Sequence, residues 1–198
     1  MDLAHLLAFN IAIIGALASP GPAFLSVMRS SLTGGRRAGI LCAIGLAVAV
    51  CVWSLLAIVG LTALFALVPW AYLALKIAGA GYLIWLAVSL WRNADKPVET
   101  GDGKGLSGFR LGLFVNLSNP KAVFFVAAIF ATVFPEMPRG ADAALILANH
   151  FVLEALWYSG CALIFASAPV RSAYMRAKAW LDRAAAAILG LLAVRIAS

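Results

Sequence analysis

Charged residues are scarce in this chain. Only 12% of its 198 residues are Asp, Glu, Lys or Arg, whereas 64% are hydrophobic and the mean hydropathy is +1.00. A soluble domain usually has about twice that share of charged residues. The composition therefore excludes an ordinary soluble domain and predicts an all-α integral membrane protein in contact with the lipid bilayer. The formal net charge of +7 indicates membrane orientation instead of a nucleic-acid partner, because the basic residues cluster in short loops between apolar stretches.

Cysteine and the motifs of common enzymes are also lacking. The three cysteines, Cys42, Cys51 and Cys161, fall within apolar stretches, without a CxxC pair or a His/Cys ligand spacing. We therefore expect small core residues and neither disulfides nor zinc ligands. The sequence contains no GxSxG, HExxH or P-loop motif. We expect the protein not to be an enzyme, and we expect no cofactor and no metal.

Six apolar stretches are long enough to cross a bilayer core about 30 Å thick, which needs about 20 residues per helix. They are residues 5–28, 38–68, 70–91, 109–134, 142–168 and 180–197. The sequence therefore predicts six transmembrane helices joined by short loops.

The basic residues lie mainly in the odd-numbered loops between these stretches. The opposite side has only Arg139 and Arg195. The odd-numbered side has Arg29, Arg36, Arg37, Arg92, Lys96, Lys104, Arg110, Arg171, Arg176, Lys178 and Arg183. Because basic loops stay in the cytoplasm, we predict that both termini lie outside it.

One extended polar linker divides the chain. Residues 92–108, RNADKPVETGDGKGLSG, contain Pro, Gly and mixed charges without apolar periodicity. We predict a first three-helix repeat over residues 1–91 and a second over residues 109–198. Three is an odd number, so the second repeat enters the membrane from the opposite side and the two repeats are inverted. A shift of one hundred residues aligns Pro20 with Pro120.

Two proline motifs interrupt the first and fourth apolar stretches. They are SPGPAF, residues 19–24, and SNPKAVFF, residues 118–125. In each, Ser or Asn precedes Pro, as at a helix start where an N-cap side chain is followed by Pro at the first helical position. We predict that the first and fourth helices are broken there, with both new N-termini near the middle of the membrane, where they attract an anion. The alternative is a pair of proline kinks that only help packing.

Four ionisable residues within the apolar stretches are candidates for a functional role. Lys121 costs about 2.5 to 3.5 kcal/mol near the bilayer centre, so a substrate carboxylate or Glu154 must offset it. Glu154 can pair with Lys121 structurally, bind a substrate amine or carry a proton. His150 lies four residues before Glu154 on the same helix face and can be a packing residue, a proton relay or a metal ligand. Lys76 is either functional or reaches the outer interface.

The motifs SPGPAF, KIAGAGYLIWLAVSLWR and FRLGLFVNLSNPKAVFF resemble those of the lysine-exporter and homoserine/threonine-resistance (LysE/RhtB) translocators. The resemblance covers essentially the whole chain in length, span number and motif order. It implies a six-helix carrier of the bacterial cytoplasmic (inner) membrane, which exports amino acids or related metabolites, is driven by protons and forms a homodimer. It also implies a substrate site at the family's motif positions, and Lys76, His150 and Glu154 are the candidate coupling or charge partners. The substrate-site residues are Pro20, Gly21, Pro22, Asn116, Ser118, Asn119, Pro120 and Lys121.

Three hypotheses follow. The first is secondary active export of a zwitterionic amino acid, with its carboxylate near Lys121 and alternating access from two rocking halves. The second is export of a divalent cation through His150 and Glu154, against which the lack of further acidic residues in the spans argues. The third is a structural or assembly protein of the membrane without transport.

Overall fold

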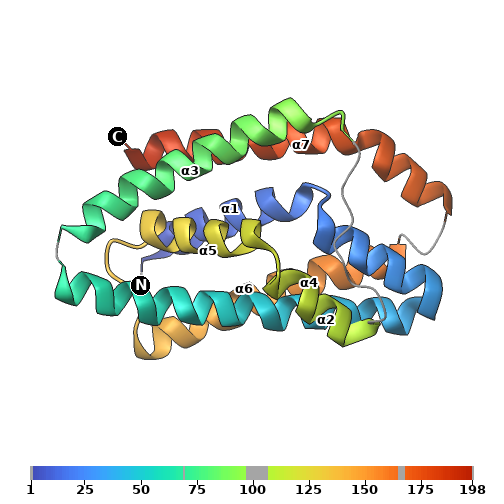
Figure 1. Ribbon diagram of the computed structural model, residues 1–198, viewed down its shortest axis with the longest axis horizontal. Coiled ribbons are helices and arrows are strands. Elements are labelled where there is room, and N and C mark those ends of the chain that lie inside the picture. The colour runs from blue at the N-terminus through green and yellow to red at the C-terminus, as the bar shows by residue number, and fades with distance from the viewer. Residues whose placement is uncertain (1, 69, 97–106, 165–167, 198) are drawn as a thin grey trace.

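The chain folds entirely into helices and connecting turns over the residues that the structure describes. The computed structural model describes residues 2–68, 70–96, 107–164 and 168–197, and it contains seven helices and no strand within those ranges (Figure 1). The helices are α1 (Leu3–Ala18), α2 (Pro22–Leu67), α3 (Ala71–Asn93), α4 (Gly108–Leu117), α5 (Pro120–Val133), α6 (Gly140–Ile164) and α7 (Ala168–Ala197). The all-helical prediction is confirmed.

Both proline motifs break the chain between helices, as predicted. At the first motif α1 ends at Ala18 and α2 begins at Pro22. At the second motif α4 ends at Leu117, α5 begins at Pro120, and the two helices are bent by 64°. A proline at the first helical position needs no hydrogen bond from its nitrogen, which explains why each later helix starts on a proline.

The predicted first loop, residues 29–37, is helical except at Gly35. This residue has φ 75° and ψ 179°, and it separates two helical runs within α2. A side chain would strain a backbone with positive φ, so glycine is the residue that permits the reversal. Figure 1 shows α2 folding back at this point, at one end of the molecule.

The helices form three layers (Figure 1). The long helices α3 and α7 pack side by side in one layer, and α2, α4 and α6 pack together in the opposite layer. The shorter α1 and α5 lie between these layers and contact both of them. One helix from each proline break, α1 from the first and α5 from the second, therefore lies at the centre of the fold.

Glycine permits a very close approach of α2 and α4. A Cβ atom at Gly112 would overlap the carbonyl oxygen of Cys42, and a Cβ atom at Gly45 would overlap that of Phe109. The two backbones are thus in direct contact, as in membrane helix pairs that meet through small residues. This contact fixes α4, and with it the second proline break, against the first half of the chain.

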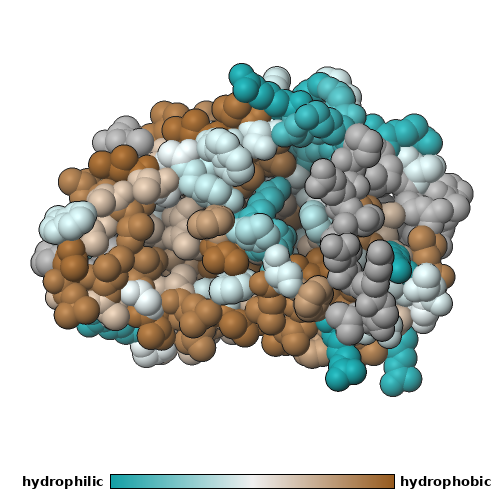
Figure 2. All heavy atoms as spheres, viewed as in Figure 1, coloured by the Kyte–Doolittle hydropathy of each residue, from teal (hydrophilic) through white to brown (hydrophobic). Residues whose placement is uncertain are grey.

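The surface is largely apolar along the length of the bundle. Leu67 is 81% exposed and Leu191 is 73% exposed, and in the view of Figure 2 the hydrophilic residues gather mainly at one end. By length and composition, the helical segments Pro22–Leu64 and Leu73–Asn93 can each cross a membrane, and α4 with α5 adds a third span if the bent pair counts as one. An apolar, lipid-compatible exterior agrees with a membrane protein, and the number of six spans stays a prediction.

The last helix starts earlier than expected. It begins at Ala168, whereas the sixth apolar stretch was predicted from residue 180. Lys178 and Arg183, which were counted as loop charges, therefore lie on α7. The charge of Lys178 is accommodated there by an ion pair with a residue one turn later on the same helix. Most of the predicted linker, residues 97–106, lies outside the described residues. The division into two repeats stays a prediction.

Candidate functional site

The two proline breaks meet at one central cavity of about 90 Å³. Gly21 and Pro22 line it from the first break, and Asn119 and Lys121 line it from the second. Helices α1, α3, α6 and α7 supply further parts of the wall. Among the predicted residues, Asn116 of α4 and both His150 and Glu154 of α6 also line the cavity. The structure thus brings together most of the residues singled out from the sequence.

Four of the predicted residues are not among those that line the cavity. Pro120 lies beside it, in a groove of about 510 Å³ that Lys121 also lines. Pro20 belongs to neither flanking helix, and Ser118 is exposed at the end of α4. Lys76 is half-buried on α3. The substrate contacts expected for Pro20, Ser118 and Pro120, and the coupling or charge-partner role expected for Lys76, stay predictions.

The second break is held by its own side chains. Asn119 is the N-cap of α5, and its side-chain oxygen accepts a hydrogen bond from the backbone N–H of Lys121 at 3.1 Å. The predicted cap is therefore confirmed. Tyr82 from α3 donates to the carbonyl oxygen of Lys121 at 3.3 Å. The first N–H groups of α5 are thus largely satisfied within the protein, since Ala122 also donates to the Asn119 carbonyl at 3.0 Å.

Asn116 ties the second break to α2. Its side-chain amide donates to the Leu46 carbonyl at 2.9 Å, and its own carbonyl accepts from the indole of Trp53 at 3.3 Å. The residue is 3% exposed. The side-chain amide nitrogen and the backbone carbonyl of Asn116 each bond to α2, so Asn116 has a clear structural role besides its place in the cavity wall.

The first break is built differently from the prediction. Gly21, not Ser19, is the N-cap of α2, no side chain caps this helix, and Pro22 rather than Pro20 is its first residue. Ser19 is the C-cap of α1 and donates instead to Asp182 on α7 at 2.5 Å. The start of α2 therefore faces the cavity without a side-chain cap, so its partial positive charge is available to a ligand.

Lys121 has no ion-pair partner among the described residues. The structural pair with Glu154, which was one of the alternatives for Lys121, is therefore absent, although both residues line the cavity. A half-buried cation at the wall of a small cavity favours the approach of an anionic group.

Glu154 has a buried carboxylate oxygen without a partner. The residue is 7% exposed, and its Oε2 atom makes no hydrogen bond to any described residue. A buried, uncompensated carboxylate costs several kcal/mol, so a proton or a cationic ligand in the cavity would stabilise it. The cavity wall therefore presents a cation on α5 and an acidic group on α6.

His150 has the polar packing role that was one of its three alternatives. Its Nδ1 atom lies 2.9 Å from the hydroxyl of Ser54, and its ring meets Phe9 edge to face with centroids 5.1 Å apart. Among the described residues, no group of three or more His, Cys, Asp or Glu side chains is arranged to hold a metal ion. The geometry therefore gives no support to export of a divalent cation.

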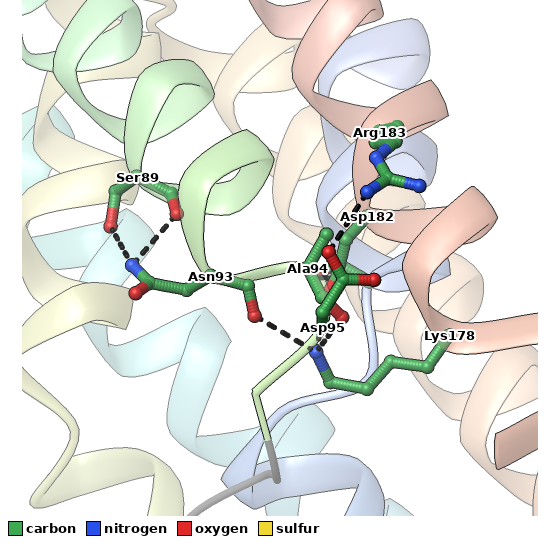
Figure 3. A network of polar contacts seen from close by, with 8 residues as sticks. Ser89, Asn93, Ala94, Asp95, Lys178, Asp182 and Arg183 are labelled. Atoms are coloured by element: carbon green, nitrogen blue, oxygen red, sulfur yellow. Dashed lines mark hydrogen bonds and ion pairs between the residues drawn. The ribbon is translucent and has the colours of Figure 1, made fainter. Parts of the chain in front are cut away.

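A buried polar network beside the cavity was missed from the sequence (Figure 3). Asp182, 3% exposed, accepts from Ser19 and from Lys178, whose ammonium lies 2.6 Å from the carboxylate. Lys178 also donates to the carbonyl oxygen of Ala94 at 2.9 Å, at the end of α3. The available signal was the spacing of Lys178 and Asp182, which are opposite charges four residues apart on one helix face.

A helical, apolar-surfaced fold with a central cavity at two helix breaks is typical of membrane translocators. The family described as LysE type translocator matches residues 14–198. This chain belongs to that family. The resemblance found in its motifs is confirmed, and membership of a translocator family agrees with the expectation that the protein is not an enzyme.

Several relatives have been named for their substrates. The threonine efflux protein of Salmonella typhimurium strain LT2 is 30% identical over 193 residues, covering 92% of this chain and 93% of the relative. The threonine efflux protein of Escherichia coli K12 is 28% identical over 183 residues, covering 88% of each chain. The homoserine/homoserine lactone efflux protein of S. typhimurium is 32% identical over 151 residues, covering 74% of this chain and 73% of the relative. No solved structure matches this chain.

Proposed function

We propose that this protein is a secondary active exporter of small amino acids or related metabolites in the bacterial cytoplasmic membrane. The observation that carries the proposal is the pairing of opposite polar groups across one cavity. Lys121 and the uncapped start of α2 offer positive potential, and Glu154 offers an unpartnered carboxylate. A zwitterion has a carboxylate and an ammonium group a few bonds apart, so it complements both groups at once.

The size of the cavity supports a small substrate. A buried water needs about 10 to 15 Å³ of such space, so 90 Å³ has room for a small solute such as alanine, serine, threonine or homoserine. The named substrates of the threonine and homoserine efflux relatives are of this size.

Alternating access would follow from two inverted halves, residues 1–91 and 109–198, rocking about the cavity. If the halves are related by a two-fold axis, equivalent helices must meet at that axis. The packing of α3 against α7 and of α2 against α6 supports this, since each pair joins helices that the alignment makes equivalent. The basic odd-numbered loops would lie in the cytoplasm, with both termini on the periplasmic side.

Purified protein in proteoliposomes tests the site. Efflux of labelled threonine should fall at least about tenfold in Lys121→Ala and in Glu154→Gln, because each removes one pole that binds the zwitterion. The matched controls are Lys96→Ala and Glu136→Gln, which change exposed residues outside the cavity and should leave efflux unchanged. Transport at the parent's rate in both cavity variants would show that the assigned site is wrong.

The same liposomes distinguish two roles for Glu154. If Glu154 carries the coupling proton, Glu154→Gln should lose efflux driven by a pH gradient but keep exchange of labelled for unlabelled threonine. If Glu154 binds the substrate amine, both activities should be lost together. We favour the proton role, because its carboxylate oxygen is enclosed and lacks any partner among the described residues.

A homodimer is expected from the family resemblance and is tested by the mass of the purified protein in detergent.

A further inference from the structure

The network of Ser19, Asp182 and Lys178 joins the ends of α1 and α3 to the middle of α7. Ser19 follows the last residue of α1, Lys178 and Asp182 lie within α7, and the carbonyl oxygens of Asn93 and Ala94 end α3. Lys178 donates to these carbonyls at 3.4 Å and 2.9 Å. An ammonium group at a helix C-terminus also interacts favourably with the helix dipole, so the two helix ends are held to α7 by several charge-assisted bonds.

The network lies beside the cavity, at its linker end. Ser19 lines the cavity itself. Leu189 of α7 lines it too, and Asp182 is seven residues nearer the linker end of that helix, which is about 10 Å of helix rise. On α3, Leu90 lines the cavity and Ala94 follows one turn later. A path from the cavity toward the end of α3 therefore meets this network.

One hydrogen bond in the network can break when the helices move relative to one another. Lys178 and Asp182 are on the same helix and stay together in any rigid motion of α7. The helices α3 and α7 pack along much of their lengths, so the bonds from Lys178 to α3 also stay together. The hydrogen bond from Ser19 to Asp182 is the polar link between the first break and the α3–α7 pair.

The opposite end of the cavity is closed by different chemistry. Phe9 packs against Phe130 and Phe134, with ring centroids 5.6 Å and 5.8 Å apart. Phe9 also contacts His150, which lines the cavity. These apolar contacts do not depend on Ser19 or Asp182, so a change in the network should open one end of the cavity only.

We propose that the hydrogen bond between Ser19 and Asp182 is a latch that closes the cavity toward the linker end. When the bond breaks, the first break separates from α7 and the cavity opens toward the end of α3. The proposal rests on the proposed transport function, because a gate has a role only where a substrate enters. It assigns Asp182 a role in controlling access, distinct from substrate binding at Lys121 and Glu154.

The test measures access to the cavity without requiring transport. Ala122 lines the cavity, so Ala122→Cys is introduced into a chain whose three native cysteines have been replaced by alanine. A membrane-impermeant maleimide is added on the membrane side that carries residues 92–108, or on the other side. In Ser19→Ala, labelling from the linker side should rise about tenfold, as expected for loss of one hydrogen bond to a charged group.

Three further variants complete the experiment. Ser19→Thr keeps the hydroxyl group and should label at the parent's rate. Asp95→Asn removes the exposed ion pair with Arg183, in which Asp95 is 73% exposed, and should also label at the parent's rate. Asp182→Asn should raise labelling as Ser19→Ala does. If Asp182→Asn fails to fold, Ser19→Ala still tests the latch, because it leaves the ion pair between Lys178 and Asp182 intact.

Two results would overturn the latch. One is an unchanged labelling rate in folded Ser19→Ala protein, and the other is an equal rise from both sides of the membrane. Either result leaves the transport proposal untouched. Conversely, a Lys121→Ala background that transports nothing should still show faster labelling when Ser19→Ala is added, so failure of the assigned binding site does not conceal the latch.

Discussion

The two proline breaks look alike in the sequence and differ in how their helix starts are held. At the second break, Asn119 caps α5 and the first N–H groups of that helix bond within the protein. At the first break, Gly21 precedes α2 and no side chain caps the helix. The difference indicates two roles: the start of α5 is held in place by bonds within the protein, whereas the start of α2 is open to a ligand.

The breaks share one feature, because each is tied to the opposite half of the chain. Asn116, before the second break, bonds to α2 through the Leu46 carbonyl. Ser19, in the first break, bonds to Asp182 on α7. Asn116 bonds to α2 twice, through its side-chain amide nitrogen and through its backbone carbonyl, whereas Ser19 bonds to Asp182 through its hydroxyl group. We infer that the second break stays in place while the first break moves.

The largest expected loss of stability comes from substitution of Gly112, and Gly15, which precedes the first break, is its comparison. A Cβ atom at Gly112 of α4 would overlap the backbone of α2 at Cys42, so Gly112→Ala must separate two helices. We expect a loss of about 3 kcal/mol of stability. At Gly15 of α1, a Cβ atom would lie 3.2 Å from the Ile188 side chain, which can adjust. Gly15→Ala should therefore be nearly neutral, aided by the better helix propensity of alanine.

Thermal unfolding in detergent measures both glycine variants under identical conditions. A Gly112→Ala protein as stable as Gly15→Ala would show that the α2–α4 contact is looser than described, and that the second break is not the fixed one.

The cap of α5 should have an intermediate effect. Asn119→Ala removes the acceptor for the Lys121 N–H and should cost about 1 kcal/mol, whereas Asn119→Ser retains a capping oxygen and should recover most of that loss. The midpoint of denaturant unfolding checks both variants. If serine and alanine prove equally destabilising, the side chain of Asn119 acts through something other than the cap.

The smallest effect on stability should come with a clear effect on transport. Gly21→Asn adds a capping side chain to the uncapped start of α2, where a Cβ atom meets nothing within 4 Å. Stability should change by less than about 0.5 kcal/mol, because glycine is only slightly worse than asparagine at this position. The new cap competes with the substrate carboxylate, so the KM for export should rise severalfold.

Gly21→Ala serves as the comparison for this variant, because it adds a methyl group without a hydrogen-bond acceptor. It should raise the KM less than Gly21→Asn does. Equal KM values for the two variants would argue against carboxylate binding at this helix start.

Local sequence signals predicted the second break well and the first break only in part. The run of Asn119, Pro120 and Lys121 contains one proline and one capping residue, so its helix start had a single solution. SPGP contains two prolines, and either can begin a helix. The helix begins at Pro22 rather than Pro20, and Ser19 is drawn into a bond with Asp182. That choice depends on a residue more than 160 positions away.

The charged residues show the same limit. The sequence indicated that Lys121 and Glu154 belong to one site, and both line the cavity. It also suggested a direct pair between them, which is absent from the described ion pairs. The pairing was set by which helix faces meet, and the described ion pair in the interior is that of Lys178 with Asp182 on α7. Lys178 had been counted with the loop residues.

The sequence by itself determined the helical, lipid-compatible character of the protein, the positions of both breaks and the residue types available for a zwitterion. These follow from composition and from local backbone chemistry, which act over a few residues. The tertiary structure decided which helix start stays uncapped, which charges are paired and which residue Ser19 bonds. Those outcomes depend on contacts between helices, where a rotation or shift of one turn changes every partner.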